Sequence, residues 1–326
     1  MIRALYTTPY IPPEFIAAHG IEPRRIFPQL GKTSGLGISK VGMCPYASTF
    51  VGEAVSADDD TIVLMATTCD QMRRAADIIE RWHGHPAHGL FLLNVPATWQ
   101  TPSSFHLYYD ELKRLSRFLQ SYGGTEPSKE KLAEQMKEYE SRRQNVLAQK
   151  RLFNARQFAE ILITQNPIAI NTKASENSSS IPIALIGGSL LSDDLYILDL
   201  IEESGGRVAL NAMEYGERTF PRKFDRRKIS EDPLLELADA YFGSIPDAFR
   251  RPNSALYIWL KERLEQERVK GVIFHHYIWC DIWHAELARF KEWTNLPVLD
   301  IHSGDDGESV RGKMRDLIQT CIQVLR

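Results

Sequence analysis

Short apolar runs rich in β-branched residues alternate with amphipathic segments of helical length along most of the chain. This alternation is typical of an α/β fold in which helices connect parallel strands. Strands are predicted over residues 3–6, 61–66 and 89–95 in the first half, and over 181–186, 207–210, 271–275 and 298–301 in the second. Helices are predicted after Pro13, after Pro45, over residues 70–83, and around the later strands. We therefore expect two Rossmann-like (flavodoxin-like) domains with parallel sheets.

A helical segment separates the two halves. Residues 128–165 are rich in strong helix formers and contain neither Pro nor Gly, so long helices are expected to join the domains. Residues 171–180 are polar and lack aliphatic anchors, which indicates a surface linker. The predicted organisation is an N-terminal α/β domain over residues 1–127, a helical connector with a linker over 128–180, and a C-terminal α/β domain over 181–326.

Composition and charge narrow the possible partners. The 326 residues include 43% hydrophobic and 25% charged residues, as in an ordinary globular protein. The 39 basic and 42 acidic residues give a net charge of −3, so we expect no nucleic-acid partner. No stretch approaches the roughly 18 apolar residues of a membrane span, and the N-terminus lacks the apolar run of a secretory signal. We expect a cytoplasmic protein that does not contact membranes.

Three of the four cysteines share one kind of local setting. Cys44 precedes Pro45 at the start of a predicted helix, whereas Cys69 and Cys280 each follow a predicted strand and precede an aspartate that begins a helix. Helix N-termini offer free backbone N–H groups and partial positive charge, which favour a thiolate. A single cysteine after a core strand is usually an inert buried residue, but three in matched settings favour binding of a soft metal.

The fourth cysteine differs from the other three. Cys321 falls within an amphipathic helix among aliphatic residues, which indicates packing in the core. The separations of 25 residues between Cys44 and Cys69 and of 211 between Cys69 and Cys280 match no zinc-finger or ferredoxin pattern. The repeated local setting, not the spacing, carries the prediction of a metal site.

Several segments together resemble the family of 2-hydroxyacyl-CoA dehydratases, which also includes the paired subunits of ATP-dependent benzoyl-CoA reductase. The resemblance spans nearly the whole chain and rests on PYIPPEF, MCPYASTFVGEA, ATTCDQMRR, LFLLNVP, ALIGGSLLSDDLYILDLIEESGGRV and VIFHHYIWCD. The most specific parts are ATTCD and the downstream IWCD. The family resemblance implies a 4Fe-4S cluster between two α/β domains, with Cys44, Cys69 and Cys280 as ligands and one iron left open.

The resemblance also implies a reaction and partners. Family members reduce an acyl-CoA thioester by one electron, which permits loss of the 2-hydroxyl group as water. The electron comes from a separate ATP-dependent iron-sulfur activator protein, and the subunits work as homodimers or as heterodimers with a similar chain. Some relatives carry a cysteine near Thr7 or Thr8, and four cysteines cannot supply the ligands of a larger double cluster. A single 4Fe-4S cluster is therefore expected here, in a lyase of the dehydratase type.

Two further residues are candidates for catalysis. The resemblance places Glu14, in the PPE motif, near the substrate as a proton donor or acceptor, although an acidic residue in a first helical turn is also favoured by the helix dipole. His275 and His276 precede Cys280, and strand alternation lets at most one of them reach the site; His275 is our candidate.

The residues leave several functions open beside the dehydratase. One alternative is a benzoyl-CoA reductase-like enzyme, and another is a subunit that relays electrons without catalysis. A structural zinc protein or a metal-free α/β protein is a third alternative. The sequence contains no Walker motif, so ATP hydrolysis would belong to a partner.

Overall fold

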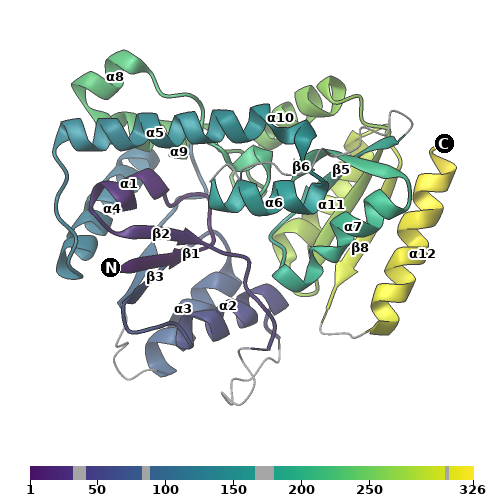
Figure 1. Ribbon diagram of the computed structural model, residues 1–326, viewed down its shortest axis with the longest axis horizontal. Coiled ribbons are helices and arrows are strands. Elements are labelled where there is room, and N and C mark those ends of the chain that lie inside the picture. Colours follow the sequence, from purple (N-terminus) through teal and green to yellow (C-terminus); the bar gives the residue numbers. More distant parts are fainter. Residues whose placement is uncertain (32–41, 83–88, 166–179, 305–307) are drawn as a thin grey trace.

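Two parallel sheets form the framework of the protein. The computed structural model describes residues 1–31, 42–82, 89–165, 180–304 and 308–326 (Figure 1). In this part of the chain, the first sheet contains β1 (Arg3–Tyr6), β2 (Glu22–Arg25), β3 (Thr61–Ala66) and β4 (Leu90–Leu93). The second contains β5 (Ile181–Gly187), β6 (Gly206–Ala212), β7 (Gly271–Tyr277) and β8 (Val298–Ser303). Every strand pair is parallel, which confirms the predicted pair of Rossmann-like domains.

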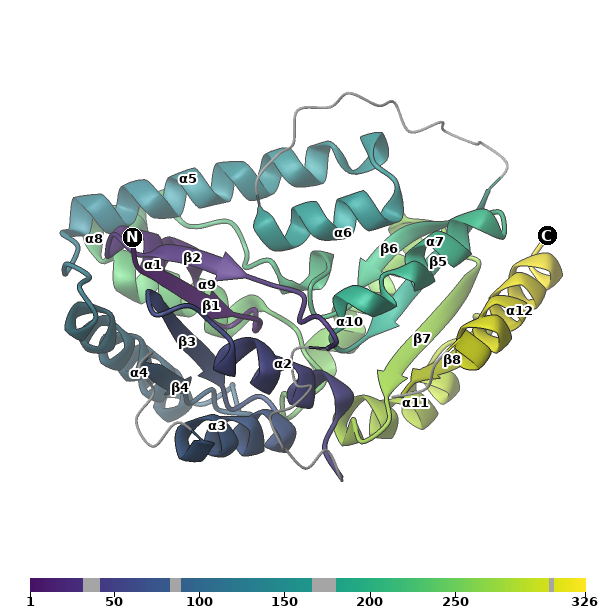
Figure 2. The same ribbon diagram turned by 60° about the horizontal axis from the view of Figure 1, so that its bottom comes forward.

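Helices cover both sheets and join them. In the first half of the chain they are α1 (Pro13–Ala18), α2 (Pro45–Val55), α3 (Asp70–Trp82), α4 (Pro102–Ser121), α5 (Lys129–Ala148) and α6 (Ala155–Thr164). In the second half they are α7 (Tyr196–Glu203), α8 (Arg226–Glu231), α9 (Pro233–Ser244), α10 (Ser254–Gln266), α11 (Asp281–Trp293) and α12 (Glu308–Val324). Figure 2 shows α6 between the sheets, and it contacts both β2 and β6. None of the helices in the described residues is long and apolar enough to cross a membrane.

One strand was missing from the sequence prediction. The segment that forms β2 has the sequence Glu-Pro-Arg-Arg, without the apolar run that marked the other seven strands. It lies at the edge of the first sheet, and in the part of the chain that the structure describes it pairs with β1 alone. An edge strand tolerates proline and charged residues because one side of it is not paired within the sheet. The strand therefore forms through its pairing with β1, which a local hydrophobicity pattern does not reveal.

The two sheets have the same strand order. The first runs β2-β1-β3-β4 and the second β6-β5-β7-β8. In each sheet the chain moves first to one side and then to the other, so the order reverses between β1 and β3 and between β5 and β7. The loops at the carboxyl ends of these strands therefore diverge and leave a crevice, where α/β proteins usually bind their ligands.

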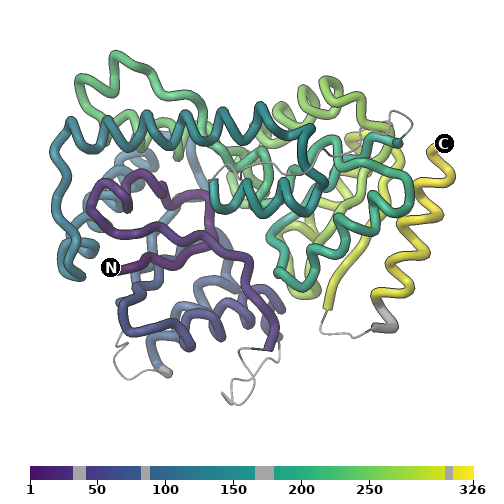
Figure 3. Tube along the Cα trace, in the orientation of Figure 1, coloured from purple at the N-terminus to yellow at the C-terminus, as the bar shows by residue number. Residues whose placement is uncertain are grey.

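The first hydrophobic core includes a segment from the second half of the sequence. Leu237 and Tyr241 of α9 belong to the same buried cluster as Leu64 of β3 and Leu112 of α4. Figure 3 shows the chain returning from the second domain to the first, where the green segment passes beside α5. This part of α8 and α9 falls in the range 181–326 that we assigned to the C-terminal domain. The chain thus passes between the domains three times: through the connector, back to α8 and α9 in the first domain, and again to α10 in the second.

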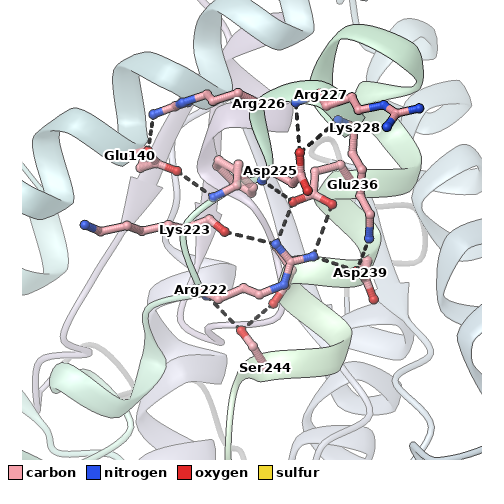
Figure 4. Close-up of polar contacts among 12 residues, drawn as sticks. Glu140, Arg222, Lys223, Asp225, Arg226, Arg227, Lys228, Glu236, Asp239 and Ser244 are labelled. Atoms are coloured by element: carbon pink, nitrogen blue, oxygen red, sulfur yellow. Dashed lines mark hydrogen bonds and ion pairs between the residues drawn. The ribbon is translucent and has the colours of Figure 1, made fainter.

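An ion-pair network fixes this returning segment (Figure 4). Arg222 pairs with both Glu236 and Asp239 at 2.6 Å, and Arg226 pairs with Glu140 of α5. Glu140 also accepts a hydrogen bond from the backbone N–H of Phe224 at 2.6 Å. The basic run at 222–228 is therefore largely neutralised by carboxylates, and its role is to hold α8 and α9 against α5.

The packing of α9 yields a testable prediction. Replacing Leu237, which is fully buried, with alanine should lower the free energy of unfolding by about 2–5 kcal/mol, because the change leaves a cavity in the first core. Leu235, on the same helix but 42% exposed, serves as a matched control. The L235A substitution should change stability by less than about 0.5 kcal/mol. Urea unfolding measures both, and equal effects would contradict the described packing.

Candidate functional site

A pocket lies where the carboxyl ends of the two sheets face each other. The empty space there, including open solvent at its mouth, is about 680 Å³. The residues that follow the strand ends supply much of its lining: Thr7 and Thr8 after β1, Cys69 after β3, Gly188 and Ser189 after β5, Glu214 after β6, and Cys280 after β7. The pocket therefore occupies the crevices of both sheets at once, and neither domain forms it alone.

Three cysteines meet in this pocket, each at a helix N-terminus. Cys44 is the N-cap of α2, Cys69 immediately precedes α3, and Cys280 is the N-cap of α11. The Cys69 thiol accepts a hydrogen bond from the backbone N–H of Met72 at 3.4 Å. Backbone N–H groups of α2 and α11 similarly interact with Cys44 and Cys280. The structure thus brings together all three cysteines that the sequence singled out, two from the first domain and one from the second.

The expectation that helix N-termini favour the thiolate is overridden by burial. Burial raises the pKa of Cys69 to about 12, although the backbone N–H groups of Met72 and Gln71 oppose this shift. Burial also raises the pKa of Cys44 and of Cys280. Without a bound cation the thiols therefore remain protonated at neutral pH. A metal reverses this balance, because its charge stabilises the thiolates and its binding releases their protons.

The three thiols are donors of the kind that iron-sulfur clusters take. The pKa of Cys280 is raised further by the charges of Cys44 and Cys69, so the three groups interact electrostatically. Yet no three His, Cys, Asp or Glu side chains among the described residues lie close enough to hold one ion. A cubane of four irons and four sulfides spans a larger space and takes thiolate ligands. Among the described residues that line the pocket there is no fourth cysteine and no histidine, and the carboxylates are Glu214 and Asp247.

Polar side chains from both domains also line the pocket and form hydrogen bonds with one another. Ser189 donates a hydrogen bond from its hydroxyl to Oε2 of Glu214, and the Tyr46 hydroxyl interacts with Ser189 and Thr7. Glu214 and Tyr46 were not predicted as site residues from the sequence. For Glu214 the available signal was its position four residues after the strand predicted over 207–210, near the strand end where parallel sheets place their ligand sites.

A buried arginine contacts two of the residues that line the pocket, Asp247 and Trp283. Arg218 is 1% exposed, and its guanidinium donates to Asp247 at 2.6 Å and to the backbone carbonyl of Ala212 at 2.8 Å. It also lies over the ring of Trp283, 5.0 Å from the ring centroid. The carboxylate of Asp247 is therefore paired with the Arg218 guanidinium. A buried carboxylate without such a partner would destabilise the fold.

Glu14 does not line the pocket. Its fully buried carboxylate pairs with Arg143 of α5 at 3.2 Å and accepts a hydrogen bond from the Tyr241 hydroxyl of α9 at 2.8 Å. This arrangement connects α1, α5 and α9 in the interior of the first domain. The structure thus places Glu14 in an internal ion pair, away from the cysteines.

His275 does not line the pocket either. It is fully buried in β7, where Nε2 and the Ser303 hydroxyl lie 2.9 Å apart. Burial lowers the pKa of His275 to about 3, so its imidazole is neutral at physiological pH. Two residues later on the same strand, Tyr277 does reach the pocket and donates to Asp194 at 2.5 Å. The tyrosine, and not the histidine, is the side chain of β7 that meets the site.

Comparison with known families agrees with this architecture. Residues 8–325 match the model of the family described as 2-hydroxyglutaryl-CoA dehydratase, D-component. The chain belongs to this family. As a member of the D-component family, the protein is a subunit of the 2-hydroxyacyl-CoA dehydratase type. The match covers both sheets, the connecting helices and the three pocket cysteines.

Other comparisons add no functional information to the D-component match. A search of curated proteins finds no match. Two solved structures of the SBP FpvC from Pseudomonas aeruginosa align with the chain. The complex with Ni²⁺ is 12% identical, with 99% of this chain and 96% of that chain covered and a TM-score of 0.25. The complex with Mn²⁺ is 10% identical, with 100% and 98% covered and the same TM-score. At this TM-score the alignments support no conclusion about this protein.

The position of Glu14 yields a second prediction. E14Q should lower the free energy of unfolding by about 3 kcal/mol, because it leaves the buried Arg143 without a negative partner. The matched control is E134Q, which removes an exposed pair with Lys131 and should cost less than about 1 kcal/mol. Urea denaturation measures both variants. Unchanged stability in E14Q would argue against a structural role for this ion pair.

Proposed function

We propose that this chain is the iron-sulfur subunit of a radical enzyme of the 2-hydroxyacyl-CoA dehydratase type. Its substrate would be a 2-hydroxyacyl-CoA thioester, from which water is eliminated after reduction by one electron. The observation that carries the proposal is the convergence of Cys44, Cys69 and Cys280 in one pocket between two Rossmann-like sheets. Membership of the D-component family supports the same reaction class.

In this proposal the three cysteines hold a 4Fe-4S cluster. When bound, such a cluster supplies one electron to the thioester carbonyl and can polarise it through an iron without a protein thiolate. The protein contributes the backbone N–H groups at the three helix N-termini, which stabilise negative charge on the sulfur ligands. Hydrogen bonds of this kind are one of the means by which proteins adjust cluster potentials.

The remaining pocket residues would position the substrate and exclude water. Apolar groups of Ala66, Met72, Ile282 and Trp283 line the walls. Such walls lower the local dielectric and protect a radical intermediate from side reactions. The hydroxyls of Tyr46 and Ser189 lie among these apolar groups and offer hydrogen bonds to a bound carbonyl or hydroxyl group.

A second candidate function is an electron-relay subunit without its own catalysis. It is favoured by the placement of Glu14 and His275, the two predicted catalytic residues, outside the pocket lining. In that case a similar subunit would bind the substrate. Titration of the reduced, cluster-loaded protein with acyl-CoA distinguishes the two candidates. A change in the electron paramagnetic resonance (EPR) spectrum of the cluster supports substrate binding at this site, and an unchanged spectrum supports electron relay.

The first prediction from this proposal concerns composition. After anaerobic purification the protein should contain about four irons and four acid-labile sulfides per chain. C69S should lose most of this iron because a pocket ligand is missing. C321S is the matched control, since Cys321 lies on α12, outside the residues that line the pocket. One zinc per chain without sulfide, or equal iron loss in both variants, would refute the cluster assignment.

The second prediction concerns the electron source. We expect no turnover of 2-hydroxyacyl-CoA by the isolated chain, because reduction of a thioester requires a strong one-electron donor and the sequence has no Walker motif. Adding an ATP-dependent iron-sulfur activator with a low-potential reductant should start turnover, in a homodimer or with a similar partner subunit. Anaerobic assays with each component omitted test this requirement. Sustained activity without any reductant would exclude the radical mechanism.

A further inference from the structure

Glu214 is a carboxylate that lies in the pocket with the three cysteines and acts on all of them through its charge. It lines the pocket together with Cys44, Cys69 and Cys280. Its negative charge contributes to the raised pKa of each of these thiols, which places it within electrostatic reach of the complete set. The pocket's other lining carboxylate in the described residues, Asp247, is paired with Arg218. Glu214 is therefore the acidic side chain available to a ligand in the pocket.

Two hydrogen bonds fix the backbone of Glu214, whereas one hydrogen bond holds its side chain. The Glu214 N–H donates to the carbonyl of Gly188 at 2.9 Å, and its own carbonyl accepts from Arg25 at 2.7 Å. The carboxyl group accepts one hydrogen bond from Ser189, through Oε2. An ionised carboxylate has two oxygens that can accept or ligate, so Oε1 can bind a metal while Oε2 keeps the bond to Ser189.

Charges of both signs act on Glu214. Burial and the negative charge of Asp247 raise its pKa, whereas the hydrogen bond from Ser189 and the positive charges of Arg218 and Arg25 oppose this rise. Iron accepts oxygen ligands as well as thiolates, and a carboxylate is the harder ligand of the two. On a cluster held by three thiolates, a carboxylate oxygen would fill the coordination site of the fourth iron. It would be displaced more easily than a fourth cysteine thiolate.

We propose that Glu214 is the fourth ligand of the cluster in the resting protein. Its carboxylate would bind the iron that the three cysteines leave open through Oε1, while Oε2 keeps the hydrogen bond from Ser189. This assignment rests on the proposed function, because it requires the cysteines to hold a 4Fe-4S cluster.

The test compares four anaerobically reconstituted full-length proteins: the wild type, E214Q, E214C and E202Q. The fourth iron is followed by Mössbauer spectroscopy of ⁵⁷Fe-loaded protein and by the EPR signal of the three-iron cluster that forms during mild oxidation. E214Q should lose the fourth iron at least about tenfold faster than the wild type, as expected when a contact that supports a metal is removed. E214C should retain it, because a thiolate at this position can ligate the same iron.

The control variant E202Q removes a comparable carboxylate outside the pocket. Glu202 lies on α7 in the same domain, is partly buried and accepts a hydrogen bond from the backbone N–H of Ala155 at 2.9 Å. Its iron loss should match the wild type. Rescue by E214C separates ligation from a merely structural role, since a cysteine cannot reproduce the shape or the hydrogen bonds of glutamate.

The outcomes separate this assignment from the proposed function. Four irons in both the wild type and E214Q, with equal rates of iron loss and equal Mössbauer spectra, would refute the role of Glu214 and leave the cluster intact. Failure of E214C to retain the iron that E214Q loses would also refute ligation. A wild-type protein that assembles no cluster would refute the proposed function and this assignment together.

Discussion

Everything that the site can do depends on two parallel sheets that face each other through their carboxyl ends. Both sheets reverse their strand order at an inner position, between β1 and β3 and between β5 and β7, and each reversal opens a crevice. The two crevices meet in one pocket. Because Cys44 and Cys69 come from one domain and Cys280 from the other, the relative position of the domains determines how far the Cys280 sulfur lies from the other two.

That relative position is secured by the path of the chain. Helix α6 contacts β2 of one sheet and β6 of the other, and α9 returns from the second half of the sequence into the first core. The buried Glu14 then connects α1 to α5 and α9 through Arg143 and Tyr241. A residue that the family resemblance placed near the substrate thus contributes to the framework that holds the two halves of the site together.

The pocket also concentrates acidic groups where water is scarce. Three thiols and Glu214 share it, and burial raises the pKa of each of them. The helix N-termini and the two arginines, Arg25 and Arg218, compensate only in part. A bound cationic centre would relieve this cost, because it stabilises the ionised ligands more strongly than water-excluded amide groups can. The electrostatics of the pocket therefore favour the same kind of ligand as its sulfur donors.

Local sequence determined the elements that form by burying apolar residues: seven of the eight strands described here, and the helix starts that carry Cys44, Cys69 and Cys280. Those features depend on neighbouring residues, so periodicity and capping patterns reveal them. Only the tertiary structure placed Glu214 in the pocket, Glu14 and His275 outside its lining, and α9 in the first core. These placements depend on which buried side chains meet across long sequence separations, such as the 129 positions between Glu14 and Arg143, and no local pattern encodes such a pairing.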